Sequence, residues 1–175
     1  MPGRWFESVC SASLEQGDIL SAFPVVQAEL TAEDVEAIVA APGEDHQLAQ
    51  KAEIIEINAI VMTQSCDLEN DKVDSVLLCP YWTDQDFVGD RSKREQVRRG
   101  NVHGWHLLNS DEILKLPLLF IEFSRIYTAS KATASAFAGS RENRPRLVSP
   151  YREHLSQAFA RFFMALVQLY EVEKG

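Results

Sequence analysis

Two apolar runs near the middle of the chain dominate its hydrophobic pattern. Residues 54–62 and 73–79 are rich in Ile and Val, and a short polar loop joins them, with Asn70 and Asp71 where the chain must turn. Residues 53–57 partly alternate, whereas 59–62 are apolar on both faces, so we expect the first strand to pass from an edge into the interior. Residues 73–79 also lack alternation. The pattern predicts a β-hairpin or β-arch at the centre of a sheet, with Pro80 ending its second strand.

Weaker patterns flank this pair of runs. A turn at Gln16 leads into a strand over 16–20 that we expect to end before Pro24, and residues 1–15 resemble a loose lead-in. Thr31 can cap a short helix that reaches Ala40, because acidic residues fill its first turn. The other predicted elements are a helix over 84–101 with Asp84 as its cap and Gly100 as its stop, strands over 105–108 and 116–127, and a loop or weak helical turn over 129–140.

The clearest helical pattern covers residues 150–171. Ser149 can cap this helix, and Pro150 suits its first position. Its apolar stripe consists of Leu155, Phe159, Phe162, Phe163, Leu166, Leu169 and Tyr170, and its opposite face carries Arg152, Ser156, Gln157 and Arg161. A stripe of this width needs a sheet or a partner to cover it. We therefore predict an α+β fold that is mainly β, with a curved antiparallel sheet or barrel, peripheral helices and a long C-terminal helix.

Composition is consistent with one domain over residues 1–175, with a barrel-like core over about 16–127 and the helix over 150–171 packed on it. The chain has 175 residues, of which 46% are apolar, enough for a hydrophobic core. No apolar run approaches the roughly 18 residues of a membrane span, and the N-terminus has no signal pattern, so we expect a cytoplasmic protein without membrane contact. Cys10, Cys66 and Cys79 are widely spaced and fit reduced thiols.

Charge divides unevenly within the net −9. Residues 1–90 hold 18 acidic and 3 basic side chains, whereas residues 91–175 hold 8 acidic and 14 basic ones. This division fits a nucleic-acid surface, a self-complementary contact such as a homodimer, or neutralisation within one fold. The basic groups that could contact RNA phosphates are Arg91, Lys93, Arg94, Arg98 and Arg99, then Arg141, Arg144, Arg146 and Arg152, and an exposed Trp105 could stack on a base.

The densest set of reactive side chains follows the first central run: Thr63, Gln64, Ser65, Cys66 and Asp67. A nucleophilic Cys66 would need a base, which His103 or His106 could supply across the fold. The alternative is a buried thiol beside an Asp67 that starts a turn. Zinc could be held by Cys66, Cys79, His103 and His106, although these residues lack the usual knuckle spacing. The pattern indicates no cofactor.

Three short segments resemble the small SH3-like barrel of the MazF/PemK/Kid toxin superfamily over residues 16–81. They are Gly17, Asp18 and Ile19 at a strand start, the strand over 58–65, and the apolar strand over 76–80. The resemblance implies a barrel closed by a helix, and an Arg-Pro pair before the second strand whose Arg serves RNA cleavage. Here Ile57 and Asn58 occupy that place. Because Asn58 cannot supply a fixed positive charge to a developing phosphorane, we expect no RNA cleavage.

Three functions remain open from the sequence. The first is a noncatalytic interaction component of a bacterial defence or toxin–antitoxin-like module that binds a protein partner. The second is an RNA-binding or divergent RNA-cleaving protein of the MazF/PemK type. The third is an enzyme centred on Cys66 or on a metal. We favour the first, because the toxin arginine is missing and no complete catalytic set can be named.

Overall fold

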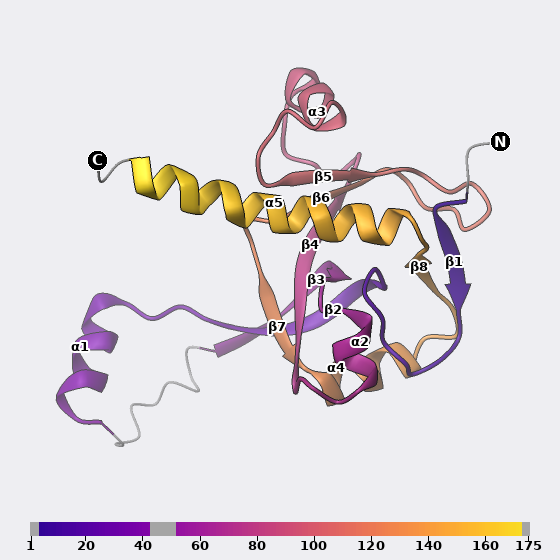
Figure 1. The fold of residues 1–175 in the computed structure, drawn as a ribbon. Helices are drawn as coiled ribbons and strands as arrows, with labels where there is room; N and C mark the ends of the chain where they lie inside the picture. The colour runs from indigo at the N-terminus through magenta and orange to yellow at the C-terminus, as the bar shows by residue number, and fades with distance from the viewer. Residues whose placement is uncertain (1–3, 43–51, 173–175) are drawn as a thin grey trace.

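The computed structural model of the chain describes residues 4–42 and 52–172, with side chains described as far as Ala165. The fold is α+β and mainly β, as predicted, with antiparallel sheets, five helices among the described residues and a long C-terminal helix (Figure 1). In chain order the elements are β1 (Phe6–Val9), β2 (Ile19–Ala28), α1 (Ala32–Ala40), β3 (Ala52–Val61), α2 (Ser65–Glu69), β4 (Ser75–Thr83), α3 (Arg91–Arg98), β5 (Trp105–Leu108), β6 (Leu119–Glu122), β7 (Tyr127–Ser130), α4 (Lys131–Gly139), β8 (Arg144–Leu147) and α5 (Tyr151–Val172).

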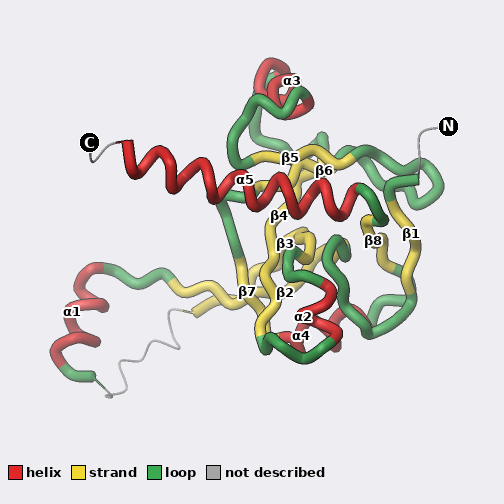
Figure 2. The backbone as a smooth tube through the Cα atoms, viewed as in Figure 1, coloured by secondary structure: helices red, strands yellow, loops and turns green. Residues whose placement is uncertain are grey.

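The main sheet has the strand order β2-β3-β4-β6-β5, and β7 pairs with β4 beside β6. Strands β1 and β8 form a separate two-stranded sheet. Within the described residues the sheets do not close into a barrel, so the open alternative of the prediction holds. Figure 2 shows α5 lying across the main sheet, and α1 standing away from it at the outer ends of β2 and β3.

The predicted central pair is present as β3 and β4, which are antiparallel neighbours with Ile60 opposite Cys79. Two details of the prediction are wrong. The connection contains the helix α2, and β4 continues through Pro80 to Thr83. Proline is tolerated there because β7 pairs with Ser75–Leu78 and β6 with Tyr81–Thr83, so no partner on that edge needs the missing N–H of Pro80.

The first predicted strand begins later and runs further than expected. β2 starts at Ile19 and passes through Pro24, which lies opposite Glu56 of β3. β2 is the edge strand of the sheet, where a proline removes no ladder hydrogen bond on the open side. A register shift between Leu20 and Phe23 places Ala22 at φ 54°, so the strand bends into a bulge before it continues.

The predicted strand over 116–127 is in fact two strands. β6 and β7 pair with different stretches of β4, and residues 123–126 separate them. The N–H of Phe123 donates to the carbonyl of Gly104 at 2.6 Å, which extends the β5–β6 ladder past Glu122, and the chain pairs with β4 again only from Tyr127. The sequence shows one apolar run here because both halves contribute to buried clusters.

Several flanking elements also differ from the expectations. Residues 1–15 contain β1, whose Phe6 lies opposite Leu147 of the unpredicted strand β8. α4 is a regular helix capped by Ser130, so the loop expected over 129–140 is wrong. α3 is shorter than expected and begins after Asp90, whose carboxylate accepts the N–H of Lys93. Gly100, at φ +71°, follows the end of α3 as predicted.

The apolar stripe of α5 packs on the sheet as predicted for the residues that the structure describes. Leu155 is buried, and Phe159 and Phe162 pack against a cluster that includes Ile121 and Phe123. Phe163 contacts the rings of Phe159 and Phe162 but stays 38% exposed. The side chains of Leu166, Leu169 and Tyr170 lie outside the described residues. This packing places α5 over two cavities that border the candidate residues.

Candidate functional site

The reactive segment over 63–67 begins where β3 ends and continues into α2. Thr63 is buried, and its hydroxyl accepts the backbone N–H of Leu77 at 2.7 Å. The hydroxyl of Ser65 accepts the backbone N–H of Gln16 at 3.1 Å, while the Gln16 side chain donates to the carbonyl of Met62 at 2.8 Å. These hydroxyl groups therefore hold neighbouring backbone in place.

Cys66 is exposed, so the expectation of a buried thiol is wrong. Its sulfur lies 3.7 Å from the side-chain oxygens of Gln64 and Asp67. Asp67 also pairs with Lys72 at 3.5 Å. His103 and His106 line a different cavity from the one that Gln64 and Asp67 border, and no histidine is among the lining residues of the latter. The described residues do not assemble a cysteine–histidine pair.

A cavity of about 720 Å³ opens beside this segment, under α5. Gln64 and Asp67 line it from the segment, Asp74 and Ser75 from the start of β4, and Ser156 from α5. Ser156 belongs to the face of α5 that was predicted to be opposite the apolar stripe, and it lines this cavity. The cavity is also lined by apolar residues, namely Met62, Val73, Leu77, Phe159 and Ala160. The reactive segment therefore borders a mixed cavity, and its hydroxyls are committed to the backbone contacts described above.

The basic helix α3 is held by local partners. The ammonium of Lys93 lies 5.2 Å from the ring centre of Trp105 and 5.5 Å from that of Phe87. Trp105 is half-buried and meets Phe87 edge to face, at 4.9 Å between ring centres. The structure therefore uses Trp105 to pack α3 on the sheet, and it does not present an exposed ring for stacking as the sequence had suggested.

The other arginines of this helix also have acidic neighbours. Arg94 pairs with Asp84 at 3.0 Å, which gives Asp84 a role different from the predicted cap. Arg98 and Arg99 both contact Glu95, at 4.0 and 2.9 Å. Arg91 is exposed at the start of the helix. Exposed pairs of this kind are weak and leave the arginines able to exchange partners.

In the second group of basic residues Arg144 and Arg146 are buried, Arg152 is partly exposed and Arg141 is exposed. Arg144 and Arg146 converge on Asp18, which is 0% exposed; Arg146 Nε donates to Asp18 at 2.6 Å, and Arg144 at 3.1 Å. Glu15 pairs with both Arg146 and Arg152. Burial alone would lower the pKa of Arg146, but the hydrogen bonds and charge of Asp18 more than offset this and raise it. The prediction that Arg144 and Arg146 are free for RNA is therefore wrong.

The structure does not bring the four candidate zinc ligands Cys66, Cys79, His103 and His106 together. Cys79 is buried, and burial, with a smaller effect from Glu122, raises the pKa of its thiol to about 12, so the thiolate that zinc needs is disfavoured. His103 and His106 lie together but away from Cys66. Nowhere in residues 4–42 and 52–172 do three His, Cys, Asp or Glu side chains gather closely enough to hold a metal ion.

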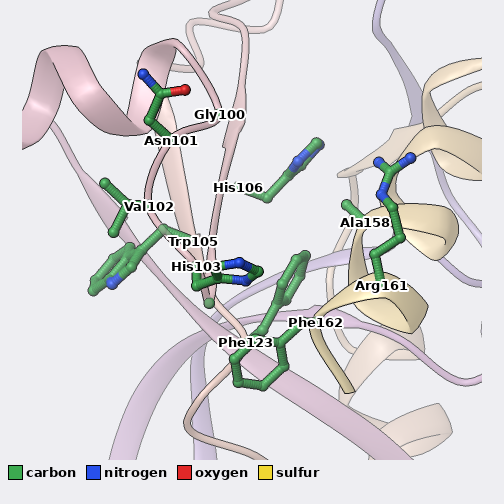
Figure 3. Close-up of a pocket in the computed structure, with 11 residues that line it drawn as sticks. Gly100, Asn101, Val102, His103, Trp105, His106, Phe123, Ala158, Arg161 and Phe162 are labelled. Atoms are coloured by element: carbon green, nitrogen blue, oxygen red, sulfur yellow. The ribbon is translucent and has the colours of Figure 1, made fainter. Parts of the chain in front are cut away.

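His103 and His106 instead line a cavity of about 360 Å³ between the loop that follows α3 and the middle of α5 (Figure 3). The His106 ring stacks on Phe123 at 6.0 Å between centres. Burial first, and then the positive charges of Arg161 and His154, lower the pKa of His106 to about 4. His106 is therefore neutral at pH 7. Sequence reasoning had assigned Arg161 to the solvent face of α5, and no local signal placed it beside these histidines.

Asn58 occupies the place of the toxin arginine and has a structural partner. Its side-chain oxygen accepts the N–H of Ala22 at 3.0 Å, which ties β3 to the bulge of β2. The bulge residue Ala22 has a positive φ, and this hydrogen bond satisfies its backbone. The position thus stabilises the sheet edge.

A projecting segment, named here the acidic arm, consists of residues 26–42 and 52–56 and carries α1 at its end. Its acidic side chains are Glu29, Glu33, Asp34, Glu36, Glu53 and Glu56, and the two stretches contain no Lys, Arg or His. Its large exposed apolar side chains are Val26, Leu30, Val35, Val39 and Ile54, which are between 46% and 74% exposed. None of the residues of α1 is buried.

Comparison with known proteins finds no matching family model, no similar curated protein and no similar solved structure. The resemblance of residues 16–81 to the MazF/PemK/Kid superfamily thus stays a prediction. None of the helices in the described part of the chain is long and apolar enough to cross a membrane.

Proposed function

We propose that the protein is a noncatalytic interaction component that binds a protein partner through the acidic arm. The observation that supports this most directly is the group of exposed apolar side chains on the arm, which neither the main sheet nor α5 covers. Contiguous exposed apolar surface is uncommon on a monomer and is typical of protein-binding sites.

The structure of α1 is consistent with a surface that a partner protein covers. Thr31 and Asp34 form a capping box, which stabilises the first turn of the helix. Val35, Ile38 and Val39 then lie on one side of the helix at helical spacing. A nine-residue helix without buried side chains is below the roughly 12–15 residues at which isolated helices become stable in water. Contact with a partner would supply the missing tertiary stabilisation.

The charge of the arm defines the chemistry of the partner. Acidic side chains surround the exposed valines, with no basic residue among them. The complementary surface is an apolar patch ringed by Lys or Arg. The setting in a bacterial defence or toxin–antitoxin-like module is part of this proposal, and its support is the sequence resemblance over residues 16–81.

The test begins with capture of the partner and is decided with the purified pair. Val35→Ser combined with Val39→Ser should weaken binding at least about tenfold, because partial burial of two valines is worth more than about 1.4 kcal/mol. Ile113→Ser is the matched control, since Ile113 is 76% exposed and lies outside the arm. The affinity of the parent should also fall as salt is raised. Equal losses for both variants, or a pair that is insensitive to salt, would contradict the proposal.

Other results would contradict the proposed binding of a protein partner and support a different function. Sedimentation of the purified chain as a dimer that Val35→Ser and Val39→Ser dissociate would make the occupant of the arm a second copy. Salt-sensitive binding of single-stranded RNA, lost in Arg98→Ala with Arg99→Ala and kept in the arm variant, would instead favour the RNA-binding function. Metal-free RNA cleavage that depends on Thr63 or Arg94 would identify a divergent nuclease.

A further inference from the structure

We propose that the cavity between the loop after α3 and the middle of α5 binds a small aromatic anion, a flat ring that carries a carboxylate or a phosphate. The cavity has a volume of about 360 Å³, within the roughly 300–1,000 Å³ of typical ligand sites. This site is separate from the acidic arm and does not depend on the proposed function.

The charge of the cavity supports an anionic ligand. Arg161 lines it from α5, and His103 and His106 line it from the opposite wall. No Asp or Glu is among its lining residues, and Arg161 makes no ion pair with any residue in the described part of the chain. The nearby acidic residue of α5, Glu153, contacts Arg152 instead. An anion entering the cavity would therefore meet a guanidinium that is free for two parallel hydrogen bonds.

The walls of the cavity support a flat ring. Trp105, Phe123 and Phe162 line it together with two glycines, as Figure 3 shows for the labelled side chains. At Gly104, which has φ +81°, an added Cβ would lie 3.1 Å from the Phe162 ring, so the backbone approaches this ring closely. Aromatic walls beside one cation favour ring stacking combined with a charge contact over binding of a bare ion.

His106 adds a neutral polar group to this wall. Burial is the largest cause of its lowered pKa, Arg161 and His154 on α5 lower it further, and His103 is the titratable group in the loop just before β5. A bound anion would offset the charge of Arg161 and favour the imidazolium form, so the pKa of His106 should rise on binding. The affinity for a carboxylate probe, which keeps its charge in this range, should consequently increase as pH falls from 7 towards 5, whereas a phosphate monoester itself takes up a proton at about pH 6.

The experiment uses the purified full chain, benzoate and uridine 5′-monophosphate as anionic ring probes, and NMR with calorimetry as readouts. Benzylamine and benzyl alcohol test the need for negative charge, and acetate and inorganic phosphate test the need for a ring. We expect binding of the ring anions with a Kd below about 1 mM and weaker binding of every control compound. Whichever of the two probes binds more tightly identifies the anionic group as carboxylate or phosphate.

Two variants localise the binding. Arg161→Gln should weaken the ring anions at least about tenfold, because a charge-assisted contact is lost. Without ligand it should also raise the NMR-measured pKa of His106 above about 4. Arg125→Gln, which removes an exposed cation that lines a different cavity, should change neither value. Benzylamine binding as tightly as benzoate, no ring anion binding below about 1 mM, or equal effects of the two variants would overturn the proposal.

Discussion

Replacing Asp18 with Asn should destabilise the protein strongly, because this carboxylate compensates two buried guanidinium groups. Asp18 accepts hydrogen bonds from the N–H of Glu15, from Arg144, and twice from Arg146. The side chains of Arg144 and Arg146 are 3% and 7% exposed, so water cannot replace the lost charge. Asp18→Asn keeps the size of the side chain and removes its charge.

The expected magnitude follows from the cost of leaving a buried charge without its partner, about 3–5 kcal/mol. Glu15 remains as a partner of Arg146, which argues for the lower half of this range. A domain of this size shifts its melting temperature by roughly 2–4 °C per kcal/mol, so a loss of about 3–4 kcal/mol should lower it by about 6–16 °C. Differential scanning calorimetry of the parent and the variant measures this shift directly.

Two further variants complete this test. Asp71→Asn removes an exposed carboxylate that pairs with Lys131, and it should leave the melting temperature near that of the parent. Asp18→Leu combined with Arg144→Met and Arg146→Met should melt above Asp18→Asn, because no buried charge is left unpaired. A melting temperature of Asp18→Asn equal to that of the parent would refute the reasoning, and a triple variant less stable than Asp18→Asn would refute its electrostatic basis.

Three further predictions concern α5, His106 and the thiols. Phe162→Ala should lower the free energy of unfolding, measured in urea, by about 2 kcal/mol. This is less than the roughly 3–5 kcal/mol expected for a fully buried Phe, because the Phe162 ring is partly exposed. Met164→Ala should change the free energy of unfolding little, since Met164 is 63% exposed. His106 takes up its proton at lower pH when folded, so stability should fall by up to roughly 3 kcal/mol as pH drops from 6.5 to about 4; urea titrations of His106→Gln across this range should lack that contribution. A thiol reagent should label Cys66 in the folded protein and reach Cys79 on unfolding; early labelling of Cys79 would contradict its burial.

Part of the candidate chemistry could be recognised in the sequence. The segment over 63–67 was singled out for its reactive side chains, and it does border a cavity. The positions of Arg161 and His106 beside one another could not be recognised, because one belongs to α5 and the other to β5. A helical pattern shows which residues share a face, but not which loop that face will meet.

Local features of the fold were determined by the sequence itself. The capping box at Thr31, the stop at Gly100 and the apolar stripe of α5 depend on residues within a few positions of one another, and all three are present in the structure. The two central strands were predicted from their apolar runs, and they are buried where they pair around Ile60 and Cys79, although Ile54 at the outer end of β3 is 74% exposed. Interactions at this range can be read from spacing alone.

Strand pairing and the burial of charge were decided by tertiary structure. Arg146 and Asp18 are 128 positions apart, and nothing near either residue indicates that each neutralises the other. Pro80 is tolerated because β6 and β7 leave a gap at that point of β4, and the run over 116–127 divides into two strands that pair with different stretches of β4. In each case the deciding energy comes from a group distant in sequence, so the local pattern is compatible with more than one structure and the long-range contact selects one.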